Sequence, residues 1–146
     1  MKKIALATIL ALAVGSAHAL ELGVTGSHAP EMKHNGVGMT LGLGGVGPVR
    51  LTAGWEKFQS EQDRFSLVGG LPLVKLDKAQ LSLKGGAVWM QNEKGANGYA
   101  GVAGLGLDLP LTKKVTFGVD VTHQKGENKV AAFDGNKVTA ALKFKF

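Results

Sequence analysis

Few side chains in this sequence could do chemistry, and the first candidates are an adjacent serine and histidine. Ser27 and His28 contain a nucleophile and a base, the minimum requirement for nucleophilic catalysis. That chemistry also needs the two groups within hydrogen-bond reach and a third group that orients the base. Because neighbouring residues of a strand point to opposite faces, an extended chain separates Ser27 from His28. We therefore predict no catalytic residues and no enzymatic activity.

Histidines and a carboxylate suggest a metal site as the second possibility. His28 and His34 lie in one polar segment with Glu31 between them, and His123 ends a later alternating segment. Imidazole and carboxylate groups bind zinc or copper. A solvated loop explains the same composition, and we predict neither a metal nor a cofactor.

The segment Gly42-Leu-Gly-Gly-Val-Gly47 matches the letters of the dinucleotide fingerprint G-x-G-x-x-G. That fingerprint works only when a helix follows, because the amino end of the helix must face the pyrophosphate. Pro48 and an alternating segment follow instead. The glycines therefore predict a turn between two strands.

The amino terminus has the pattern of a secretory leader. Met1-Lys-Lys precedes an apolar run from Ile4 to Val14, and small residues end at Ala19. A retained membrane anchor is the alternative, but the run is shorter than the roughly 20 residues that a spanning helix needs. We predict a signal peptide at residues 1–19, cleaved after Ala19, and a single exported domain at residues 20–146.

Composition limits the class of the exported domain. The chain has no cysteine, so no disulfide stabilises it. Its formal charge of +6 includes Lys2 and Lys3 of the leader, which leaves +4 for residues 20–146. These charges are dispersed and form no dense patch, so we predict no nucleic-acid partner. A mild basic balance favours contact with anionic lipid headgroups or with polysaccharide.

Alternation of apolar and polar residues divides the domain into eight candidate strands. Polar, mostly longer segments (28–35, 59–63, 92–96 and 125–135) alternate with short ones (45–47, 73–77 and 110–112), as in an up-and-down outer-membrane barrel. The expected strands are Leu20–Ser27, Gly36–Gly44, Pro48–Phe58, Arg64–Pro72, Lys78–Gln91, Asn97–Leu109, Lys113–Gln124 and Asn136–Phe146.

Each candidate strand has one apolar face and one face rich in Gly, Ser and Thr. A soluble lipocalin-like barrel shares this alternation, but its polar face meets water and should carry many long charged side chains. Small residues instead suit the crowded interior of a narrow membrane barrel. The fold class predicted is therefore all-β, an eight-stranded antiparallel up-and-down transmembrane β-barrel. Its few polar-face charges are expected to form a network in the lumen: Glu21, Arg50, Glu56, Lys84, Asp108, Asp120, Lys143 and Lys145.

Aromatic residues cluster at the ends of the apolar face. Trp55, Phe65, Trp89 and Tyr99 all fall at the long-loop ends of their strands. Aromatic girdles at the membrane interfaces are typical of membrane barrels. These four residues are the expected girdle, and Phe144 and Phe146 fall at the opposite rim.

The leader, the eight alternating strands and the ending Leu142-Lys-Phe-Lys-Phe146 resemble the small eight-stranded outer-membrane proteins of Gram-negative bacteria, the OmpA transmembrane domain and OmpX-like class. The segment Gly101–Leu111 is also similar to a Gly-rich strand and turn of the YfaZ-like family. The resemblance implies residence in the outer membrane, with its lipids and lipopolysaccharide as surroundings. It also implies that Phe144 and Phe146 are an assembly signal for the outer-membrane assembly machinery.

For function, the pattern favours a structural or surface-interaction role with a packed polar lumen. Segments 28–35 and 125–135 are candidate contacts for a surface partner, because loops on rigid scaffolds often carry recognition. The longest segment includes an apolar stretch, Val130 to Phe133. Two alternatives stay open: a narrow porin-like pore for small solutes, and an enzyme that modifies lipid A.

Overall fold

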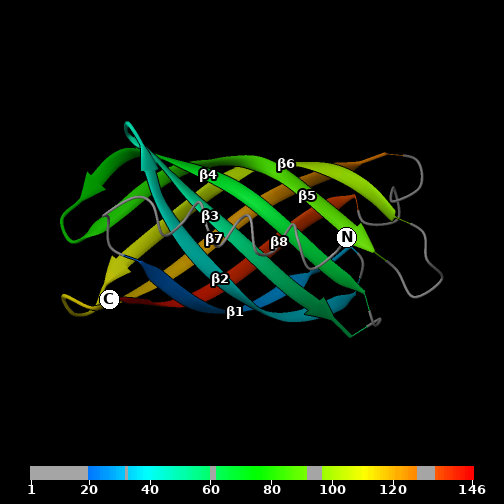
Figure 1. Cartoon of the computed structure of the whole chain (residues 1–146), viewed down its shortest axis with the longest axis horizontal. Coiled ribbons are helices and arrows are strands. Elements are labelled where there is room, and N and C mark those ends of the chain that lie inside the picture. The colour runs from blue at the N-terminus through cyan, green and yellow to red at the C-terminus, as the bar shows by residue number, and fades with distance from the viewer. Residues whose placement is uncertain (1–19, 32, 60–61, 92–96, 128–133) are drawn as a thin grey trace.

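A computed structural model describes residues 20–31, 33–59, 62–91, 97–127 and 134–146 (Figure 1). The expected signal peptide, residues 1–19, lies outside this set. Within the described ranges, no helix is long and apolar enough to cross a membrane. The eight strands are β1 (Glu21–Ala29), β2 (His34–Val46), β3 (Val49–Phe58), β4 (Asp63–Leu76), β5 (Ala79–Gln91), β6 (Asn97–Pro110), β7 (Val115–Gly126) and β8 (Gly135–Lys145).

Each strand is paired with its sequence neighbours, and the first strand is paired with the last, which closes the sheet. In the closing ladder Leu22 lies opposite Phe144, and Val24 lies opposite Leu142. The short connections and the carboxy terminus gather at one end of the barrel, at the left in Figure 1. The predicted fold class is confirmed.

Two of the three short connections are tighter than the sequence suggested, whereas residues 111–114 join β6 to β7 in place of the expected 110–112. Gly47 and Pro48 alone join β2 to β3, and Gly47 has a φ of 61°, which suits glycine. Only Asp77 and Lys78 join β4 to β5, so the predicted turn at 73–77 is wrong. Its residues continue β4 past Pro72 through an irregularity between Pro72 and Val74, and such a bulge accommodates a proline inside a ladder.

The fingerprint-like glycines also belong to this hairpin. Gly42 and the residues that follow it to Val46 continue strand β2, and strand β3 starts at Val49 with no intervening helix. No helix amino end therefore faces this segment, as the dinucleotide chemistry would require.

The two faces of the barrel differ as the alternation predicted. Large apolar side chains point outward along every strand; Val37, for example, is 68% exposed, and Leu105 is 47% exposed. Small hydroxyl residues point inward and are buried, among them Thr25, Ser82 and Thr122. A continuous apolar surface of this extent is suited to lipid rather than water. The chain is thus a transmembrane β-barrel.

The orientation of the faces predicts an asymmetric response to a new charge. Leu105→Arg places a cation in the apolar belt and should lower the free energy of unfolding by about 2 to 4 kcal/mol if it lies near the midplane. Urea titration of the refolded protein in lipid vesicles, followed by tryptophan fluorescence, measures the change.

Leu111→Arg is the matched control, because Leu111 is also exposed (55%) but lies in the short connection after β6. It should change the stability little. Equal losses at positions 105 and 111 would contradict the assignment of the belt.

Candidate functional site

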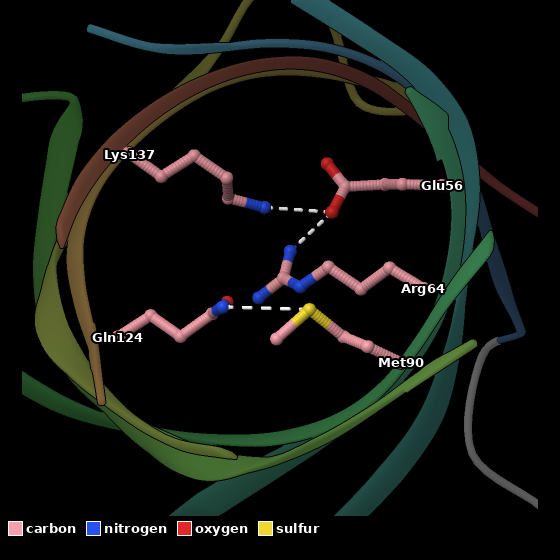
Figure 2. Close-up of polar contacts among 5 residues, drawn as sticks. All are labelled: Glu56, Arg64, Met90, Gln124 and Lys137. Atoms are coloured by element: carbon pink, nitrogen blue, oxygen red, sulfur yellow. Dashed lines mark hydrogen bonds and ion pairs between the residues drawn. The ribbon is translucent and has the colours of Figure 1, made fainter. Parts of the chain in front are cut away.

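The lumen is crossed by a three-residue ion cluster built from two consecutive strands and the last strand of the barrel. Glu56 of β3 lies between Arg64 of β4 and Lys137 of β8, and both cations contact the same carboxylate oxygen, Oε2 (Figure 2). The Lys137 Nζ atom donates to that oxygen at 2.7 Å, and Arg64 Nη1 donates to it as well. Barrel closure is what brings Lys137 to the other two residues.

Register and a glycine position this cluster. Glu56 and Arg64 are directly opposite each other on β3 and β4, so their inward side chains meet across the ladder. Gly38 is opposite Glu56 on β2, and a Cβ at Gly38 would lie 2.7 Å from Glu56 Cγ. The missing side chain therefore leaves room for the carboxylate.

Arg64 and Lys137 were not among the residues predicted for the lumen network. Each directly precedes an outward apolar residue, Phe65 and Val138 respectively. The phase of the alternation therefore contained the signal that both point inward. Both residues lie near the start of a strand and next to a polar connection, so their inward orientation was not recognised from the sequence.

Burial makes the cluster energetically important. The three side chains are nearly inaccessible to solvent, with 6% of Glu56 and 10% of Lys137 exposed. Removing one partner of a buried ion pair leaves an uncompensated charge, which costs about 3 to 5 kcal/mol. Glu56 is the only carboxylate of the cluster, so both cations depend on it.

Beside the ion cluster, part of the lumen is apolar. Val88, Met90, Ala100 and Val102 form a buried group on β5 and β6, and Gln124 of β7 donates through Nε2 to Met90 Sδ at 3.6 Å (Figure 2). The interior at this level is therefore filled by polar and apolar side chains, and the apolar group adds to the packed polar lumen expected. The apolar group needs only two inward residues from β5 and two from β6.

Two further ion pairs lie closer to the short-turn end. Lys143 Nζ donates to Asp108 Oδ1 at 2.6 Å, and Lys84 Nζ lies 3.6 Å from Asp120 Oδ1. Glycines make the space for them. A Cβ at Gly118 would lie 2.6 Å from Asp108 Oδ1, so a larger residue would displace that pair.

Two cavities remain in the barrel. An inner cavity of about 80 Å³ is lined by Thr25, Glu56 and Asp120, among others. A larger one of about 610 Å³ lies toward the short-turn end and is lined by the remaining charges predicted for the network, Glu21, Arg50 and Lys145. Among the described residues these three form no ion pair, whereas the other five predicted residues (Glu56, Lys84, Asp108, Asp120 and Lys143) do.

The four residues of the expected girdle form one continuous row across four strands. Trp55 is opposite Phe65, Phe65 is opposite Trp89, and Trp89 is opposite Tyr99. The rings of Phe65 and Trp89 have centroids 5.4 Å apart with an interplanar angle of 34°, and Tyr99 is 62% exposed. The row covers β3 to β6 on the outward face.

The carboxy-terminal aromatic residues lie at the opposite rim. Phe144 points outward from β8 and is opposite both Leu22 and Val115. Phe146 is 75% exposed, and its backbone N–H donates to the carbonyl of Leu20 at 3.0 Å. Both rings are therefore accessible beside the strand that closes the barrel.

The residues first considered for chemistry do not form a reactive group. Ser27 is buried in the lumen, whereas His28 is exposed on the outside. His28 and His123 instead contact asparagine side chains, Asn35 at 2.6 Å and Asn136 at 3.1 Å. In the part of the chain that the structure describes, no group of three or more acidic or histidine residues is arranged to hold a metal.

Glu31 joins the first long connection to the start of strand β8. Its carboxylate accepts hydrogen bonds from the backbone N–H of Asn136 at 2.6 Å and from Asn136 Nδ2 at 2.9 Å. The apolar stretch Val130 to Phe133 lies outside the described residues. The described part of this rim is thus stabilised by contacts between residues 105 positions apart.

Several solved β-barrel structures are similar to this chain. The N-terminal β-barrel domain of OprF from Pseudomonas aeruginosa superposes with a TM-score of 0.71 at 14% identity, covering 88% of this chain and 97% of that one. De novo designed transmembrane β-barrels give a TM-score of 0.64 at 15% identity, covering 88% and 95%. The outer-membrane protein Ail of Yersinia pestis gives 0.55 at 8% identity, covering 88% and 99%.

No protein-family model matches the chain, and no curated protein matches its sequence. At these identities the likeness concerns the fold alone. The fold defines the class as that of the small eight-stranded transmembrane β-barrels.

The shared carboxylate predicts an order of stability among lumen variants. Glu56→Gln leaves two buried cations without a counter-charge and should lower the free energy of unfolding by about 3 to 5 kcal/mol. Lys137→Met retains the Glu56–Arg64 pair and should cost less. Urea unfolding in vesicles ranks the variants, and Lys57→Gln, on the exposed outer face of the same strand, serves as the control. A larger loss in Lys137→Met than in Glu56→Gln would contradict the central role of Glu56.

Proposed function

We propose that this protein is a small outer-membrane β-barrel with a structural or surface-interaction role and no catalysis. The observation that carries the proposal is the filled lumen, in which the Glu56 ion cluster and the apolar group around Met90 occupy the interior. Eight strands enclose little more than the space that side chains fill, and channels generally have larger strand numbers. Lipids and lipopolysaccharide are the proposed surroundings of the apolar belt.

The proposed orientation places the short turns in the periplasm and the long connections outside the cell. Outer-membrane barrels have this asymmetry, and an exported chain with a leader at residues 1–19 would reach the membrane from the periplasmic side. The segments 28–35 and 125–135 would then face the exterior as the surface that meets a partner. The Glu31–Asn136 contacts connect the segment 28–35 to the residue that directly follows the segment 125–135, which supports a joint surface.

A closed lumen predicts that the refolded protein does not conduct. In planar bilayers we expect no stable, ion-selective current steps, because the buried cluster and the apolar group fill the interior. A protein of known pore conductance, inserted under the same conditions, checks the sensitivity of the bilayer. Reproducible steps from the wild-type barrel would favour the narrow-pore alternative instead.

The lipid-modifying alternative is tested by overexpression. The described residues give no support for a nucleophile and base in contact, since Ser27 points into the lumen and His28 points outward. Mass spectra of lipid A from cells with and without the overexpressed protein should therefore be the same. New acylation or deacylation products would establish an enzyme.

We also propose that Phe144 and Phe146 form the signal read by the outer-membrane assembly machinery. Deletion of Phe146 should reduce the amount of folded protein in the outer membrane several-fold, while refolding of the purified chain in detergent should be unchanged. Heat-modifiable migration on a gel measures both. Loss of refolding in detergent as well would mean that Phe146 acts through stability rather than recognition.

A further inference from the structure

The larger cavity forms an open vestibule in the half of the barrel nearer the short turns. Its volume of about 610 Å³ is within the range of small-molecule sites, about 300 to 1,000 Å³. The residues that line it include Arg50, Lys84, Lys143 and Lys145, which lie in the halves of their strands nearer the short turns. We give this cavity the name vestibule.

Positive charge predominates on the wall of the vestibule. Four cations line it, but only two carboxylates do, Glu21 and Asp108. Asp108 is bound to Lys143 at 2.6 Å, and Glu21 lies directly opposite Lys145 on the neighbouring strand. Even if Glu21 neutralises Lys145, Arg50 has no counter-charge, since it forms no ion pair with any described residue.

Arg50 and Lys84 stand on either side of a glycine. Arg50 of β3 is opposite Gly70 of β4, and Gly70 is opposite Lys84 of β5. Because adjacent strands lie about 4.8 Å apart, the two cationic residues have their backbones roughly 10 Å apart. A Cβ at Gly70 would lie 3.6 Å from Lys84 Cδ, so a side chain there would enter the space between the cations. Lys84 Cδ, Nζ and Cε lie 3.6, 3.7 and 3.8 Å from that Cβ position, so the Lys84 side chain lies over the glycine.

Lys84 faces this cavity, although it is ion-paired with Asp120 and its side chain is only 12% exposed. Its Nζ lies 3.6 Å from Asp120, which is beyond good hydrogen-bond distance, and it lines the vestibule as well as the inner cavity. Arg50 is exposed, and a guanidinium can donate two parallel hydrogen bonds to an oxyanion. A cleft lined by charge of one sign also concentrates counter-ions.

From this arrangement we infer that the vestibule binds a phosphate-bearing anion, with Arg50 and Lys84 as its main donors on either side of Gly70. The ligand is either a free phosphorylated small molecule or the phosphate headgroup of a lipid at that end of the barrel. The inference goes beyond the structural role proposed above and holds whether or not the lumen conducts.

Inorganic pyrophosphate is the probe for this site. Titration calorimetry on the barrel refolded in an uncharged detergent should show saturable binding that weakens as salt is added. Arg50→Gln should weaken it at least tenfold, as expected for a lost charge-assisted contact. Lys57→Gln removes the same charge from the outer face of the same strand and should bind like the wild type.

The sources of the phosphate are distinguished in nanodiscs. If a headgroup occupies the vestibule, pyrophosphate should bind more weakly in discs of phosphatidylglycerol than in discs of phosphatidylcholine, and the difference should vanish in Arg50→Gln. If a free molecule is the ligand, the wild-type barrel should bind pyrophosphate with the same affinity in both kinds of nanodisc at high ionic strength.

Absence of saturable pyrophosphate binding by the folded wild-type barrel would overturn the inference. Equal weakening by Arg50→Gln and Lys57→Gln would overturn it too, because it would indicate a general charge effect. Heat-modifiable migration confirms folding of each variant. Should Arg50→Gln not refold, Lys84→Gln provides the same readout.

Discussion

The structure depends on the ladder between β1 and β8. Within a bilayer no water can pair with an exposed sheet edge, so each strand needs partners on both sides. The closing register, with Val24 opposite Leu142, provides the last of these partners. It also brings Lys137 to Glu56 in the lumen and Asn136 to Glu31 at the rim. These two contacts therefore follow from closure.

Closure at eight strands leaves an interior that side chains fill. Charges are tolerated there only with partners, and each ion pair of this lumen joins a carboxylate to a cation on another strand. Gly38 and Gly118 stand where a Cβ would meet these groups. At these two positions glycine leaves the space that long charged side chains require.

The strands could be predicted because period-two alternation is a local property of the chain. The faces of Leu105 and Thr122 follow directly from it. The end of β4 could not be predicted in this way, since Pro72 indicated a turn, whereas a bulge allows the ladder to continue to Leu76. A bulge depends on the partner strand, and local composition does not reveal it.

The sequence by itself determined the class of fold, the strand number and the residues that point inward, because each depends only on the order of apolar and polar residues. Tertiary structure decided which charges are partners. Glu56 and Lys137 are 81 residues apart, and only register and closure bring their side chains together. The same three-dimensional placement left Arg50 at the vestibule wall without an ion-pair partner among the described residues, a property that no local pattern contains.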